Sequence, residues 1–254
     1  MRNDNEIRLQ LLQLGAASDS FTKQALNRIA GICDLMLEED LPANVREKLA
    51  EIDRECCCLL RNRLLLNCLA EGVASDASAG KNCSFAGVYA NCCRTVKAIC
   101  DSAGKEFSFS EFLPEYELSL PADKLVLLIL LPVALAFEHD PDAGVRLIAS
   151  RKGKRIELEF TVSGKMPPVA ELAEECRKTD RSSGLFFTEP LLALTLTETA
   201  AACGAALSVD KNKISISFRR AETPSESLAA PESYIDNRFS LPYIVLADIV
   251  RREI

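Results

Sequence analysis

One stretch of the sequence limits the possible folds more than any other: residues 125–137 are all apolar and include Pro132. A helix that crosses a bilayer needs about 20 apolar residues, so this run is too short and predicts a buried core helix over residues 121–138. A helix that is apolar all round must be covered on every side. With 254 residues, 48% of them hydrophobic, the chain is long enough for one large domain or two ordinary ones.

The charge balance argues against nucleic acid as a partner. Lys and Arg number 30 against 37 Asp and Glu, which gives a net charge of -7. Such a chain has no overall field to hold a nucleic-acid backbone, so we expect no nucleic-acid partner.

The first residues, Met1 to Glu6, lack the apolar segment of a secretory signal. We therefore expect a cytoplasmic protein without membrane attachment.

The sequence contains 11 cysteines, and their spacing argues against a metal site. An odd number argues against a closed disulfide framework, and no CxxC pair occurs. Cys56, Cys57 and Cys58 would point about 100° apart on a helix, so they cannot converge on one ion without outside ligands. We predict no metal and interpret the cysteines as small buried hydrophobes, with a redox or cluster role as the alternative.

Two amphipathic helices are predicted near the N-terminus. Leu26, Ile29, Cys33 and Met36 repeat at steps of three and four, which predicts a helix over residues 20–38 that ends before Pro42. A second helix over residues 44–71 carries a similar apolar seam, made of Val45, Leu49, Ile52, Cys56, Leu59 and Leu66. So short a connection makes the two helices antiparallel, and pairing two copies into a four-helix bundle covers the seam. We therefore expect a homodimer.

The rest of the chain alternates between helix and strand patterns. Helices are predicted at 85–102, 121–138, 169–177 and 189–202, and strands at 105–112, 115–119, 144–149, 155–162, 206–209 and 213–218. The predicted fold class is α+β: an N-terminal antiparallel helical hairpin followed by an α/β sandwich with a mixed sheet.

This pattern predicts four segments. Residues 1–19 form an N-terminal helical or flexible segment, 20–72 the hairpin dimerisation domain, 83–220 the sandwich, and 221–254 a C-terminal linker and short helix. We expect that last helix to dock onto the sheet domain or onto a partner subunit.

Three stretches resemble the core of sensor histidine kinases. Residues 25–36 resemble the first helix just after the phosphoacceptor histidine, residues 45–52 the second helix, and residues 123–131 the stretch that leads into the asparagine box. The resemblance covers residues 20–220. It implies a dimerising hairpin followed by a Bergerat-type ATPase-like domain. The chain is also similar to histidine phosphotransferases that combine such a hairpin with a domain that has lost ATP binding.

The sequence departs from that family at its functional positions. The resemblance places Ser20 where the phosphoacceptor histidine is expected and Val133 where a Mg²⁺-binding asparagine is expected. Ser163 begins the segment that corresponds to the adenine-binding Asp-x-Gly-x-Gly motif. Pro190 and Leu192 fall where a Gly-x-Gly loop would hold phosphate. Serine cannot form a phosphohistidine, and an isopropyl group cannot coordinate Mg²⁺.

These departures favour a non-catalytic relative of histidine kinases with no cofactor. The resemblance implies that the receiver domain of a response regulator docks near the start of the first helix, which makes Ser20, Lys23, Gln24 and Asn27 candidate contacts. The alternative is a divergent ATP-dependent protein kinase whose nucleotide site has been rebuilt from other residues.

Two further clusters have simple structural interpretations. His139, the single histidine, lies among acidic residues directly after the long apolar helix, where we expect a solvated turn that caps the helix. Residues 151–155 are basic around Gly153, which is typical of an exposed hairpin tip.

Overall fold

The computed structural model of the protein describes residues 22–33, 35–37, 39–74, 83–111, 116–178, 188–219 and 240–250. The chain divides into two compact units, Met1–Leu60 and Arg61–Ile254, and the boundary lies within helix α2 (Ala43–Ala74). The predicted segment 1–19 lies outside the described residues. The bounds of the four predicted segments remain predictions.

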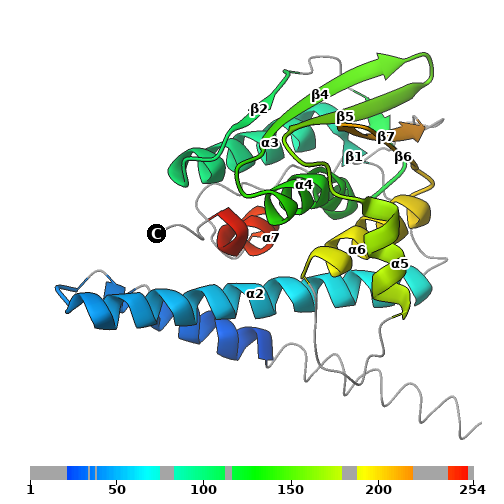
Figure 1. Cartoon of the computed structure of the whole chain (residues 1–254). Helices are drawn as coiled ribbons and strands as arrows, with labels where there is room; N and C mark the ends of the chain where they lie inside the picture. Colours follow the sequence, from blue (N-terminus) through cyan, green and yellow to red (C-terminus); the bar gives the residue numbers. More distant parts are fainter. Residues whose placement is uncertain are drawn as a thin grey trace, which may run out of the picture. The chain divides into compact units, whose positions relative to one another are not determined.

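The first unit contains the predicted helical hairpin. Residues 22–33 and 35–37 are helical, and α2 begins directly after Pro42, whose carbonyl accepts hydrogen bonds from the backbone N–H groups of Val45 and Arg46. The buried apolar residues recur at helical spacing on both helices: Leu26, Ala30 and Cys33 on the first, and Leu49, Cys56 and Leu60 on α2. Figure 1 shows the two helices side by side.

Only part of the predicted apolar seam is buried inside this hairpin. Leu26, Cys33, Leu49 and Cys56 are buried as expected. Ile29, Ile52 and Leu59 remain 42%, 45% and 53% exposed. The apolar pattern is therefore wider than two helices can cover, and its second half faces outward.

The second unit is built on a mixed five-stranded sheet in the order β2-β4-β5-β7-β6. Its strands are β2 (Phe107–Phe109), β4 (Gly144–Lys152), β5 (Arg155–Ser163), β6 (Ala206–Asp210) and β7 (Lys213–Arg219). β2 is parallel to β4, and the other neighbours are antiparallel. Along β5 and β7 every second side chain is buried, so one face of the sheet belongs to the core.

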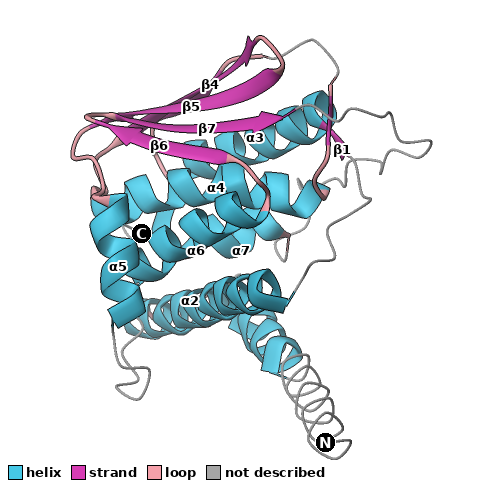
Figure 2. Ribbon diagram, turned by 90° about the vertical axis from the view of Figure 1, so that its right-hand side faces the viewer, coloured by secondary structure: helices cyan, strands magenta, loops and turns pink. Residues whose placement is uncertain are grey.

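Helices cover that apolar face. α3 (Phe85–Ser102), α4 (Ala122–His139) and α6 (Thr188–Ala202) lie beneath the sheet, as Figure 2 shows. α3 begins at Ser84, whose hydroxyl accepts a hydrogen bond from the backbone N–H of Gly87 at 3.4 Å. The predicted apolar helix corresponds to α4, and all its residues from Leu125 to Phe137 are buried.

Two shorter helices extend this layer. α5 (Val169–Lys178) packs against α6 and buries Val169 and Ala173. α7 (Leu241–Val250) packs against α4 and α3, on the side of the helix layer that faces away from the sheet (Figure 2). Val245 and Leu246 in α7 are fully buried. The C-terminal helix thus docks onto the sandwich, which agrees with one of the two expected docking sites.

The sequence missed one small element and misplaced one turn. β1 (Cys83–Ser84), for which no strand was predicted, pairs with β3 (Glu117–Leu118) in a separate two-stranded sheet, and β3 lies within the strand predicted at 115–119. β4 continues to Lys152, so the turn contains only Gly153 and Lys154. Gly153 has a φ of +64°, as a type II′ turn requires at its first central residue.

No helix in the described part of the chain combines the length and apolar character needed to span a bilayer.

The burial of α7 predicts that it contributes to the stability of the second unit. Leu246→Ala should lower the free energy of unfolding by about 2–5 kcal/mol, because it leaves a cavity against α4 and α3. Urea unfolding followed by circular dichroism measures this. The control is Val209→Ala on β6, where the side chain is 42% exposed and the change should stay within about 0.5 kcal/mol. Equal, small effects of the two substitutions would show that the packing of α7 contributes nothing.

Candidate functional site

Three of the positions that the resemblance assigns to nucleotide binding lie on α4 and α6, two helices that pack against each other. Val133 on α4 and Leu192 on α6 are both fully buried, and Pro190 in the first turn of α6 is buried as well. Ala136, one turn beyond Val133, is also fully buried. The structure thus brings three of the five altered positions to neighbouring helices, in an apolar environment.

Ser163 has a structural role at the end of β5. Its hydroxyl accepts a hydrogen bond from the backbone N–H of Gly144 at 2.8 Å. The same hydroxyl donates to the carbonyl of Gly144 at 3.3 Å. Gly144 and Ser163 are cross-strand partners at the end of the β4–β5 ladder. The side chain therefore closes the end of this ladder.

Asp140, the residue directly after α4, holds the segment that follows β5 in place. Its carboxylate accepts hydrogen bonds from the backbone N–H of Lys165 at 2.9 Å and from that of Asp142 at 3.2 Å. These bonds, chiefly the one from Lys165, hold the pKa of Asp140 below its ordinary value. The carboxylate therefore ties the end of α4 to the segment after β5.

Gly164 lies between these two hydrogen-bonded positions and cannot be replaced without strain. Its φ is +131°, a conformation that L-residues with a side chain rarely adopt. A Cβ atom there would lie 2.6 Å from Oδ2 of Asp140. A glycine is thus required by the close approach of the Asp140 carboxylate, whether or not a ligand binds.

The single histidine connects the same two helices. His139 is the last residue of α4, and its Nδ1 contacts Oε1 of Glu189 in the first turn of α6. The two side chains are only 24% and 26% exposed. A carboxylate at a helix N-terminus interacts favourably with the helix dipole. The expected solvated turn is therefore wrong for His139, because this side chain is partly buried and pairs across the helix layer.

An exposed ion pair also links α5 to α6. The guanidinium of Arg177 donates to the carboxylate of Glu198 at 2.7 Å. Together with the buried Val169 and Ala173, this contact holds the segment after β5 against α6. Apolar packing and the ion pair between Arg177 and Glu198 thus hold α5 against α6.

The candidate docking residues lie at the start of the first helix. Ser20 lies outside the described residues, so its position is not part of the structure. Lys23 and Gln24 are exposed, and Asn27 is half-buried on the next turn. The Oδ1 atom of Asn27 is buried and accepts no hydrogen bond within the described residues. Two of the four candidates are therefore accessible to a partner.

The cysteines behave largely as small hydrophobes. Six of them are buried: Cys33, Cys56, Cys83, Cys92, Cys93 and Cys100. Burial raises the pKa of Cys83 and of Cys100 to about 12, so neither is a thiolate near neutral pH. Within the described residues, no three His, Cys, Asp or Glu side chains are grouped so that they could hold a metal ion.

Sequence reasoning missed two contacts at this site. Glu189 was not singled out, because its partner His139 is 50 positions away and only the packing of α4 on α6 brings them together. The hydrogen bond that the backbone N–H of Lys165 donates to Asp140 was missed because the two residues are 25 positions apart. The one available signal was Gly164, an isolated glycine at the end of a predicted strand, which often marks a close backbone approach.

The fold is similar to that of histidine kinases. Full-length ShkA, solved in complex with AMPPNP, matches with a TM-score of 0.51 and 18% identity, over 83% of this chain and 46% of that one. This chain thus spans about half the length of ShkA. Histidine kinase ThkA, solved with the response regulator protein TrrA, matches with a TM-score of 0.48 and 15% identity, over 87% and 65% of the two chains. A bacterial phosphotransferase matches with a TM-score of 0.42 and 15% identity, over 81% and 95%.

The chain therefore has a histidine-kinase-like core, as the sequence resemblance predicted. At 18% identity, the similarity to ShkA shows the fold and not the activity. No family model matches the sequence, and no curated protein matches it either.

The geometry around Gly164 predicts a large cost for a methyl group there. Gly164→Ala should destabilise the second unit by at least about 1–3 kcal/mol, because the backbone is strained and Cβ meets the Asp140 carboxylate. Thermal unfolding of the purified protein measures the change. Gly104→Ala is the control, since Gly104 also has a positive φ, +67°, but has open space around it. An effect no larger than that of Gly104→Ala would contradict the close approach.

Proposed function

We propose that this protein is a non-catalytic, histidine-kinase-like signalling or scaffold protein that binds another protein and uses no cofactor. We propose the domain organisation expected from the sequence: a hairpin dimerisation domain over residues 20–72, a degenerate ATPase-like domain over residues 83–220, and a C-terminal linker and helix over residues 221–254.

One observation carries this proposal: three of the positions matched to nucleotide ligands, Val133, Pro190 and Leu192, are apolar and buried on two helices that pack together. Mg²⁺ requires oxygen ligands, and Val133 supplies none. Phosphate is held by backbone N–H groups that approach closely, and Pro190 has no N–H to offer. Opening a nucleotide cavity at these positions would expose Val133 and Leu192 to water, at a cost of about 25 cal/mol per Å² of apolar surface.

The absence of nucleotide binding can be tested by thermal unfolding. Mg-ATP at millimolar concentration should leave the melting temperature unchanged. A ligand at about 100 times its Kd would stabilise the protein by roughly 2.7 kcal/mol, which shifts the melting temperature by several degrees. Magnesium with inorganic triphosphate at equal ionic strength is the control. A shift with Mg-ATP alone would instead support the divergent ATP-dependent kinase.

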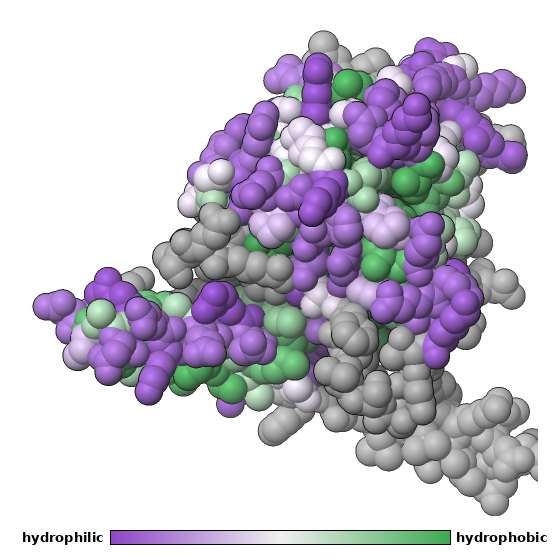
Figure 3. All heavy atoms as spheres, viewed as in Figure 1, coloured by the Kyte–Doolittle hydropathy of each residue, from purple (hydrophilic) through white to green (hydrophobic). Residues whose placement is uncertain are grey.

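We also propose that the hairpin forms a homodimer. Its exposed apolar residues share a helical spacing and lie on both helices: Ile29, Ile32, Leu35 and Met36 on the first, and Ile52 and Leu59 on α2. They are 36–66% exposed, and Figure 3 shows apolar residues interrupting the polar surface of the hairpin. Soluble monomers rarely expose a continuous apolar stripe, and a second hairpin with the same stripe would complete a four-helix bundle.

Charged substitutions in the apolar stripe should separate the dimer. Ile32→Glu with Leu59→Glu removes four apolar side chains from a symmetric interface, and each contributes about 1.5–3 kcal/mol when buried. The dimer dissociation constant should therefore rise by at least about 1000-fold, as sedimentation velocity at micromolar concentration would show. Asn44→Glu with Lys48→Gln changes the net charge equally on exposed positions of α2 and should leave the dimer intact. A wild-type protein that is monomeric would contradict the proposal.

The partner that we propose is the receiver domain of a response regulator, docked at the start of the first helix. The exposure of Lys23 and Gln24 supports this choice, with Ser20 and Asn27 as further contacts implied by the resemblance. Since serine replaces the phosphoacceptor histidine, we propose that this contact binds the partner without accepting a phosphoryl group on histidine.

A further inference from the structure

The sheet brings basic residues from three strands into one row, which the sequence did not indicate. Lys152 on β4 lies directly opposite Arg155 on β5, and Arg155 lies directly opposite Arg219 on β7. Directly opposite residues point to the same face of a sheet, so these three side chains share the face away from the helices. All three are exposed.

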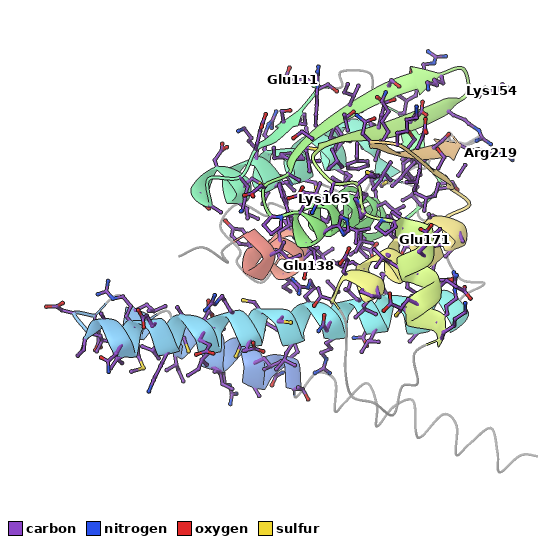
Figure 4. The ribbon with its side chains drawn as sticks, in the orientation of Figure 1. Glu111, Glu138, Lys154, Lys165, Glu171 and Arg219 are labelled. Atoms are coloured by element: carbon purple, nitrogen blue, oxygen red, sulfur yellow. The ribbon has the colours of Figure 1, made fainter. Side chains whose placement is uncertain are left out.

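The turn adds further positive charge to this row. Lys154 is exposed in the two-residue turn between β4 and β5. Arg151, the last residue but one of β4, lies opposite the buried Ile156 and therefore points to the other face of the sheet. Figure 4 shows Lys154 at the tip of the β4–β5 hairpin and Arg219 at the same end of the sheet. We call Lys152, Lys154, Arg155 and Arg219 the basic corner.

Three of these charges have no acidic partner in the described part of the chain. Lys152 pairs with Glu157, which raises the pKa of the Lys152 ammonium. Arg151 donates to the hydroxyl of Tyr116 at 2.9 Å, and its guanidinium also lies over that ring. In contrast, Lys154, Arg155 and Arg219 form no ion pair among the described residues.

Such an arrangement is unfavourable for the isolated protein. Like charges directly opposite each other on neighbouring strands destabilise a sheet, and here two such pairs follow one another. The chain as a whole is acidic, with a net charge of -7, so it has carboxylates to spare for pairing. A negatively charged group bound at the corner would offset this cost.

The size and rigidity of the corner indicate what that partner is. Three neighbouring strands span about 10 Å, which matches a compact group of carboxylates rather than an extended polyanion. The II′ turn at Gly153 fixes the tip, so little entropy is lost on binding. A membrane or a nucleic-acid duplex would also meet the acidic remainder of this chain and be repelled by it.

We propose that the basic corner is a second protein-binding surface, which takes a carboxylate-rich segment of a partner protein. It does not depend on the proposed function, since it uses the open face of the sheet and neither the hairpin nor the α4–α6 contact. Arg155 and Arg219 bind the carboxylates through paired N–H groups, and Lys154 adds charge at the tip.

The test uses the full chain and a fluorescein-labelled hexaglutamate peptide, with fluorescence anisotropy at low salt. Lys154→Ser, Arg155→Ser and Arg219→Ser together should weaken binding at least tenfold, by about the effect expected for three lost charge contacts. The matched control removes three exposed charges elsewhere in the second unit, Arg146→Ser, Lys165→Ser and Lys211→Ser. It should keep the Kd within about twofold of wild type. Arg155→Lys with Arg219→Lys, which retains the charge, should retain most of the binding.

Three results would overturn the proposal. One is equal weakening in the matched control, because binding would then follow net charge alone. Another is no peptide binding by the wild-type protein at low salt. The third is that phosphatidylserine vesicles or a DNA duplex bind more tightly than the peptide at the same ionic strength, and that only the triple variant of the basic corner loses this binding. Should the triple variant fail to fold, Lys154→Ser alone, at an exposed turn position, decides between the same outcomes with about a threefold loss expected.

Discussion

The complete burial of α4 is the constraint on which the second unit depends. Every residue from Leu125 to Phe137 is removed from water, and no single neighbour can achieve that. The sheet covers one side of α4, α3 and α6 flank it, and α7 covers the side away from the sheet. The apolar contact of α4 with each neighbour therefore decides where that neighbour lies. Even Pro132, which costs a helix one hydrogen bond, is accommodated inside α4 by this packing.

The same packing bears on what the site can do. Two of the positions that the sequence resemblance assigns to nucleotide ligands carry the buried apolar side chains of Val133 and Leu192. The polar groups nearby are engaged in structural contacts: His139 with Glu189, and Asp140 with the backbone of Lys165. Our proposal of a non-catalytic protein rests on these two observations: apolar side chains at the assigned ligand positions, and nearby polar side chains that make structural contacts.

Two features on the described surface carry our proposals of interaction with other proteins. The hairpin exposes an apolar stripe, which in our proposal pairs with a second copy of the chain. The open face of the sheet exposes a row of like charges, which in our proposal meets carboxylates of another protein. Hydrophobic and charged surfaces select different partners, so the two proposed interactions can operate independently.

The sequence by itself determined the elements and their order. Residues 85–102 were predicted as the helix that the structure shows, and the alternation of residues 155–162 located β5, because burial on one face leaves a direct periodic signal in the chain. It also determined which positions of the family's motifs carry residues that cannot bind Mg²⁺ or form a phosphohistidine, since this depends on side-chain chemistry alone. Only the tertiary structure decided which half of the hairpin seam is buried, that His139 meets Glu189, and that Arg219 joins the basic turn in one row. These facts depend on strand register and helix packing between residues far apart in the chain, and local periodicity contains no information about such pairings.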